Sequence, residues 1–101
     1  MKVLAIGRPR AGADVRGEVV LHAAEEMRAL WQLYRDGVVR EMYMPGQQPG
    51  AVLVLETPAI QDAEAALASL PLVTAGVIEF ELTELRPFAA FSVLFAGQPP
   101  M

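Results

Sequence analysis

The order of the apolar segments constrains this chain more than any other feature. Segments with strand-like and helix-like spacing follow one another with short connections, in the order strand, helix, strand, strand, helix, strand. Their predicted ranges are 2–7, 18–36, 38–44, 51–56, 57–70 and 77–83. In the last segment, 77–83, apolar and polar residues alternate, which puts Ile78, Phe80 and Leu82 on one face. This βαββαβ order predicts an α+β domain with a four-stranded antiparallel sheet and two helices on one face.

The two helical segments carry recognisable boundary residues. Gly37 is a suitable residue to follow the C-terminus of the first helix. Thr57 is predicted to cap the second helix, with Pro58 at its first position and Pro71 at its end. Residues 8–17 are predicted to form a loop, the best candidate for a lid. Spacing of three and four residues predicts the buried face of the first helix, formed by Val20, Ala23, Ala24, Met27, Leu30, Trp31 and Tyr34.

The chain is more apolar than a small domain needs to be. All 101 residues fit one domain, yet 53% of them are hydrophobic. Charged or polar residues interrupt every apolar run before it reaches the roughly 20 residues of a membrane span. Strands 2–7 and 51–56 are apolar on both sides, so the sheet face without helices would expose an apolar patch. Self-association is therefore expected, as a homodimer or a larger homo-oligomer, with two sheets packed face to face.

The end of the chain is predicted to form an arm, residues 88–101. Phe88, Phe91 and Phe95 fall on a terminal segment that is either a short helix or an extended strap. Three phenylalanines need a surface to cover, in the same domain or in a neighbouring subunit. Residues 98–101 are expected to be frayed.

Composition argues against several classes of function. The net charge is −4 and no basic stripe is present, which argues against nucleic-acid binding. There are no cysteines, so disulfides and thiolate chemistry are excluded. One histidine without cysteine does not make a typical zinc site, and no glycine-rich phosphate loop precedes a helix. We therefore expect no metal, no cofactor and no membrane partner. The segment 1–7 is too short for a signal sequence, so the predicted location is cytoplasmic.

A set of residues in the second and last thirds of the chain resembles one known family. The matching residues are Arg35-Asp36-Gly37, Arg40, Tyr43, Glu56, Leu70-Pro71-Leu72, Ile78-Glu79 and Pro87. Their order and spacing resemble the muconolactone delta-isomerase family of the dimeric α+β barrel superfamily. The resemblance implies a ferredoxin-like subunit that dimerises into a barrel. It also implies an isomerase that moves a proton on a small carboxylate or lactone. Glu41 and the apolar tail depart from the family pattern, so the alternative is a non-catalytic dimeric module that binds a small molecule or a protein.

The chemistry of the side chains and the family resemblance together suggest candidate site residues. Arg40 lies on a strand among apolar neighbours, where it would bind a substrate carboxylate or pair with a glutamate of the sheet. Glu56 and Glu79 are the favoured proton-transferring residues among the sheet glutamates, although alternating glutamates often form a solvated face. His22 is a further candidate because histidine titrates near neutrality, or else a surface residue. Tyr43 and Trp31 would line a pocket or pack in the core or dimer contact.

Overall fold

The fold is that of a computed structural model, which describes residues 1–97. The predicted fraying of residues 98–101 concerns a segment outside the described residues. The described elements are β1 (Lys2–Pro9), α1 (Val15–Arg35), β2 (Val39–Tyr43), β3 (Ala51–Glu56), α2 (Ile60–Ala68), α3 (Pro71–Thr74), β4 (Ile78–Leu85) and the 3₁₀ helix η1 (Ala89–Phe95). Their order confirms the predicted βαββαβ arrangement, with α3 as a short addition.

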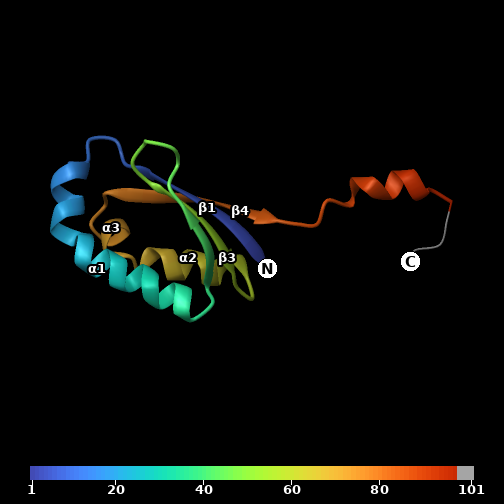
Figure 1. The fold of residues 1–101 in the computed structure, drawn as a ribbon, viewed down its shortest axis with the longest axis horizontal. Coiled ribbons are helices and arrows are strands. Elements are labelled where there is room, and N and C mark those ends of the chain that lie inside the picture. Colours follow the sequence, from blue (N-terminus) through green and yellow to red (C-terminus); the bar gives the residue numbers. More distant parts are fainter. Residues whose placement is uncertain (98–101) are drawn as a thin grey trace.

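The four strands form one antiparallel sheet in the order β2-β3-β1-β4. Helices α1, α2 and α3 all lie on one side of it (Figure 1). Val3 pairs with Leu55, and Ala5 pairs with Leu53 on one side and Leu82 on the other. Because side chains alternate along a strand, these residues all face the helices, and the core forms there. The α+β fold with its helices on one face is as predicted.

The opposite face of the sheet carries no helix. Its centre is a stripe of four partly exposed apolar side chains from the two middle strands: Leu4, Ile6, Val52 and Val54. Strand β4 borders the stripe with charged pairs, in which Arg8 lies 3.7 Å from Glu81 and Arg10 lies 3.9 Å from Glu79. We call this surface the uncovered sheet face. The predicted apolar patch is thus present, and it is narrower than the whole sheet.

Helix α1 begins earlier than predicted. A carboxylate oxygen of Asp14, Oδ1, accepts a 3.2 Å hydrogen bond from the backbone N–H of Gly17, so the helix starts at Val15 rather than at residue 18. Strand β1 also runs on to Pro9. The predicted loop over residues 8–17 therefore shrinks to residues 10–14. Gly37 follows the helix with φ +77°, which confirms its predicted role as the residue after the C-terminus.

The predicted buried face of α1 is wrong for every residue except Leu30. Val20 is 76% exposed and Trp31 is 58% exposed, although both were expected to face inward. The inward side instead consists of Val15, Glu18, His22, Glu26, Ala29, Leu30 and Leu33. This set has the same spacing of three and four residues as the predicted one, but it includes three polar side chains. Hydrophobic residues occupy much of the helix circumference, so periodicity alone does not select between the two sets.

The second helical segment also differs in detail. Ala59, not Thr57, precedes the first residue of α2, and the carboxylate of Asp62 accepts a 3.1 Å hydrogen bond from the N–H of Ala59. The hydroxyl of Thr57 donates to the carbonyl of Ala59 at 2.7 Å. Pro71 does not simply end the helical region, because it opens the short helix α3. Proline suits this first position, since its missing N–H would have no partner there.

The described part of the arm, residues 88–97, extends away from the domain beyond the end of β4 (Figure 1). It contains η1, which shows that the predicted short helix and the predicted extended strap both form in part. Phe88 packs edge to face on Phe91, with ring centroids 5.1 Å apart. The molecule measures 59 × 26 × 20 Å. Within residues 1–97, no helix is both long enough and apolar enough to cross a membrane.

Candidate functional site

A pocket of about 500 Å³ opens between α1, the sheet and the β2–β3 hairpin. Its walls are mostly apolar, with Met27 and Leu30 from α1, Leu53 from β3, and Phe80 from β4. Its volume lies in the range of small-molecule sites, about 300–1,000 Å³. Among its lining residues, Glu26 and Tyr43 are the ionisable ones. A second hollow of about 490 Å³ lies beside Met1 and Pro87, and its charged lining residues include Glu84 and Arg86, which pair with each other at 3.2 Å.

Two glycines shape the wall of the pocket where β1 ends. A Cβ on Gly7 would lie 2.6 Å from the ring of Phe80, so the missing side chain lets that ring lie against β1. Gly50 has φ +126°, and a Cβ there would collide with the carbonyl oxygen of Gly7. The hairpin therefore closes tightly on β1 at this point. Together these two positions set the shape of the cavity at the end of the sheet.

Glu26 is the buried residue of α1, only 6% exposed. Its Oε1 accepts a 3.0 Å hydrogen bond from the backbone N–H of Leu72, at the first turn of α3. That N–H belongs to a helix start, where no carbonyl of the same helix is available to it. Among residues 1–97, the other oxygen, Oε2, has no hydrogen-bond partner, while Glu26 lines the pocket. One carboxylate oxygen is therefore anchored, and the other is left without a hydrogen bond from the described residues.

The surroundings of Glu26 favour its protonated form. Burial raises the pKa of this carboxyl, while the hydrogen bond from Leu72 and the charge of protonated His22 partly oppose that rise. Enzymes often use a carboxyl whose pKa is raised by apolar surroundings as a general acid or base, and buried structural carboxyls have raised pKa values as well. The same group also ties α1 to α3, so it has a structural contact in addition to its place in the pocket.

His22 lies one turn before Glu26 on the inward side of α1. Its Nε2 is 3.2 Å from Oε2 of Glu18, another turn further back. The imidazole is about three-quarters covered, with 24% of the side chain exposed, which is more burial than its position in the sequence predicted. His22 does not line the pocket, but its charge acts on Glu26. The three residues form a line along the helix at intervals of one turn.

The two favoured sheet glutamates lie outside the pocket. Glu56 pairs with Lys2 in the strand register, and its carboxylate lies 3.6 Å from the N-terminal amine. Glu79 pairs with Arg8 at the other end of β1, and its carboxylate lies 3.9 Å from Arg10. Both carboxylates are on the uncovered sheet face. The structure does not bring them together, and their predicted catalytic role stays a prediction.

The predicted binding residues are also dispersed. Arg40 is exposed, and its Nε donates a hydrogen bond to the carbonyl of Gly37, so the guanidinium is held near its own turn. Trp31 stacks on Tyr34 with ring centroids 5.8 Å apart and does not line the pocket. Tyr43 is part of the pocket lining. Its hydroxyl donates a 2.7 Å hydrogen bond to Glu41, and this bond raises the tyrosine pKa.

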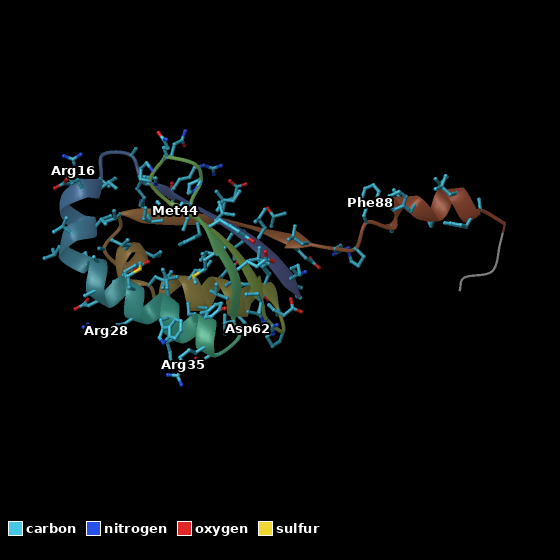
Figure 2. The ribbon with its side chains drawn as sticks, viewed as in Figure 1. Arg16, Arg28, Arg35, Met44, Asp62 and Phe88 are labelled. Carbon is cyan, nitrogen blue, oxygen red and sulfur yellow. The ribbon has the colours of Figure 1, made fainter. Side chains whose placement is uncertain are left out.

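Figure 2 shows how the labelled side chains are distributed around the fold. Met44 lies on the segment that enters the β2–β3 hairpin, on the rim of the pocket. Arg28 and Arg35 project outward from α1, away from the sheet. Phe88 lies on the arm, far from the rest of the domain. Within residues 1–97, no group of three or more metal-ligating side chains is placed to hold an ion.

Comparison with solved structures shows the fold of the chain. It is similar to 5-chloro-2-hydroxyhydroquinone dehydrochlorinase from Burkholderia phenoliruptrix in complex with 2,5-dihydroxybenzoquinone, with a TM-score of 0.67 and 14% identity over 85% of this chain and 94% of that one. It is also similar to muconolactone isomerase, with a TM-score of 0.63 and 18% identity over 87% and 93% of the two chains. No protein-family model matches the sequence, and no curated protein matches it. The resemblance to muconolactone isomerase is thus confirmed at the level of the fold.

Proposed function

We propose that this protein is an isomerase-like enzyme that moves a proton on a small carbonyl compound, with Glu26 as the acid–base group. One observation carries the proposal. Glu26 is buried, it lines an apolar cavity of about 500 Å³, and a backbone N–H holds one of its two carboxylate oxygens. This residue replaces Glu56 and Glu79 in the proposed mechanism, because neither of those lines the cavity.

The proposed reaction moves one hydrogen and one double bond. The carboxylate of Glu26 removes a proton from a carbon next to the substrate carbonyl, and an enolate conjugated with a neighbouring double bond results. Glu26, now a carboxylic acid, returns the proton to the far carbon of that system. The double bond shifts and the atoms balance. A raised pKa suits both steps, because the group must bind the proton and then release it.

The cavity favours a neutral ring compound over a strongly anionic one. Arg40 is held near Gly37, and no positively charged side chain lines the pocket within residues 1–97. An unsaturated lactone or a quinone-like ring would fit walls of this kind. The two similar structures are an isomerase named for a lactone and a dehydrochlorinase that holds a dihydroxybenzoquinone, and these ligand types support the choice.

We also propose a homodimer. The apolar stripe on the uncovered sheet face, with Leu4 and Val54 near its centre, would be buried when two sheets pack together. The ion pairs of β4, such as Arg8 with Glu81, would then lie at the margin of the contact. The barrel predicted from the sequence is the natural result of this packing.

A non-catalytic binding module is the second candidate. It is favoured by the sparse polar lining of the pocket, which within residues 1–97 has no second buried ionisable side chain beside Glu26 to orient a substrate. Such a protein would keep the cavity and bind a small apolar molecule without changing it.

The test uses Glu26→Gln, which keeps an acceptor for the N–H of Leu72 but removes the proton-transferring group. Glu25→Gln is the matched control, because Glu25 is exposed on the same helix. Purified protein is incubated in D₂O with a panel of unsaturated lactones and quinones, and isomerisation and deuterium uptake are followed by proton NMR. We expect catalysis by the wild type and by the control, and a loss of about 10²–10⁴-fold in Glu26→Gln. Equal rates in all three proteins would overturn the role of Glu26, and binding without exchange would favour the second candidate.

A further inference from the structure

We propose that α1 of one copy of this chain packs, through its exposed side, on the exposed side of α2 in a second copy. The contact joins two unlike surfaces, so it is separate from the face-to-face packing of two sheets proposed above. It involves neither the uncovered sheet face nor the carboxyl of Glu26, and it holds whether or not the protein is an enzyme.

The exposed side of α1 carries a continuous row of large apolar and aromatic side chains. Their exposed fractions lie between 46% and 76%, and they are Val20, Leu21, Met27, Trp31 and Tyr34. Trp31 stacks on Tyr34 with ring centroids 5.8 Å apart, so the two rings form one aromatic surface. Single exposed apolar residues are common, but a contiguous apolar patch is typical of an interaction surface.

The charge on this side of α1 is positive. At about 100° per residue, Arg28 and Arg35 lie about 100° and 80° around the helix from Met27. By the same count Glu25 lies about 160° from Met27, on the opposite side. Both arginines project away from the sheet (Figure 2), and within residues 1–97 neither forms an ion pair.

The exposed side of α2 has the opposite character. Ala65 and Ala68 are exposed at its centre, while Asp62 and Glu64 lie about 60° and 100° to either side of Ala65. Within the described residues neither carboxylate forms an ion pair. Residues 41–85 of the sequence contain no lysine, arginine or histidine. This side of α2 is therefore shallow and negatively charged.

The two helix surfaces complement each other in size and in charge. The large rings of Trp31 and Tyr34 require a surface of small side chains for close packing, and the alanines of α2 provide one. The arginines of α1 would then face the carboxylates of α2, within the Debye length of about 8–10 Å. Tryptophan, tyrosine and arginine are also the residue types that most often dominate the binding energy of a protein interface.

The other surfaces of the chain fit the exposed side of α1 less well. A contact between two α1 helices would bring arginines together without carboxylates between them. On the uncovered sheet face the charges are already paired, as in Arg8 with Glu81 at 3.7 Å. Within one subunit, α1 and α2 lie on the same side of the sheet and their exposed sides are directed away from their own core (Figure 1). The two surfaces can therefore meet only between copies.

Trp31 provides a direct test, because it is the only tryptophan in the sequence. Its fluorescence emission and its quenching by acrylamide, a neutral quencher, are measured over a range of protein concentrations, with light scattering in parallel. The full-length variants are Arg28→Glu, Glu64→Arg and the combination of both. Glu25→Arg is the matched control, since it makes the same change of charge as Glu64→Arg at an exposed position outside the contact.

We expect Trp31 of the wild type to be shielded at high concentration and to become exposed as the assembly dissociates on dilution. Each single charge reversal should raise the concentration needed for shielding by at least about tenfold, because it places like charges opposite each other. The combined variant should recover shielding and particle mass, since the charges are again opposite. Glu25→Arg should behave as the wild type does.

Four results would overturn the proposal. Trp31 that is fully quenched at every concentration would mean that nothing covers this side of α1. Shielding that Glu64→Arg leaves unchanged would mean that a surface other than α2 covers it. A combined variant no better than the single variants, or an equal loss in Glu25→Arg, would mean that the charges of α1 and α2 do not face each other. These readouts need no substrate, so they are independent of the proposed catalysis.

Discussion

The backbone N–H of Leu72 donates a 3.0 Å hydrogen bond to Oε1 of Glu26, across 46 residues of sequence. This hydrogen bond ties the start of α3 to α1, and it involves an ionisable group in the apolar wall of the pocket. Its two partners respond differently to pH, because only the carboxyl can change its charge. The stability of the fold is therefore linked to the ionisation of Glu26.

The first prediction concerns stability against pH. The pKa of Glu26 is raised in the folded state above its ordinary value of 4.5, so the folded protein holds a proton that the unfolded chain has already lost. The contribution of Glu26 to the free energy of unfolding should be largest below about pH 4.5. It should fall as pH rises through the folded-state pKa of Glu26. The loss is about 1.4 kcal/mol for each unit by which the two pKa values differ.

Glu26→Gln should remove this dependence. The variant should match the wild type in free energy of unfolding at pH 4 and exceed it at pH 8, and urea titrations at several pH values measure both. Glu25→Gln should follow the wild type throughout. A variant that is less stable than the wild type at pH 8 would show that the charged form of Glu26 is favoured by the fold.

The second prediction concerns His22. The charge of its protonated form lowers the pKa of Glu26, so His22→Gln should move that pKa further upward. Carbon-13 NMR of the Glu26 carboxyl as a function of pH would measure the shift directly. Arg28→Gln is a suitable control, since Arg28 projects outward from the same helix (Figure 2). An unchanged Glu26 titration in His22→Gln would mean that the two groups are not coupled.

The third prediction concerns Gly50. Alanine at this position would need a φ of +126° and a Cβ in collision with the carbonyl of Gly7. We expect Gly50→Ala to destabilise the protein by about 1–3 kcal/mol, because the hairpin must shift away from β1. Gly46→Ala in the same hairpin is the comparison, since Gly46 also has a positive φ, +65°, but a Cβ there meets no atom within 4 Å. Chemical denaturation of both variants should show the larger loss at Gly50.

The fourth prediction concerns the proposed sheet contact. Val54 lies on the uncovered sheet face, and a glutamate there would have to be buried if two sheets pack together. Val54→Glu should therefore shift the protein to a smaller species in light scattering, while Gln61→Glu on the exposed side of α2 should not. A wild-type protein that is already a single subunit at micromolar concentration would remove the basis of the dimer.

The arrangement of strands could be predicted from the sequence because each strand and helix end is marked by residues close together in the chain. The alternation of Ile78, Phe80 and Leu82 identifies the inward face of β4, and the structure places all three toward the helices. Gly37 marks the end of α1 for an equally local reason, its positive φ. The order of such segments leaves few ways to build a sheet.

The candidate site around Glu26 could not be predicted in the same way. Glu26 sits in a helix with hydrophobic residues on several sides, and the inward set that contains it has the same period as the set that contains Trp31. The partner of Glu26 is a backbone N–H 46 residues away, and backbone contacts of this kind leave no mark in a side-chain pattern. One signal was available, namely the spacing of Glu18, His22 and Glu26 at successive turns, with apolar residues between them.

Strand β2 lies at one border of the sheet, and its pairing with β3 is interrupted between Val39 and Glu41. A bulge at the outer strand, beside the charged side chains of Arg40 and Glu41, makes that border a poor template for another strand. The β2 strands of two copies therefore do not readily pair into one continuous sheet. Fibre growth by strand addition at this edge is disfavoured by the shape of a single five-residue strand.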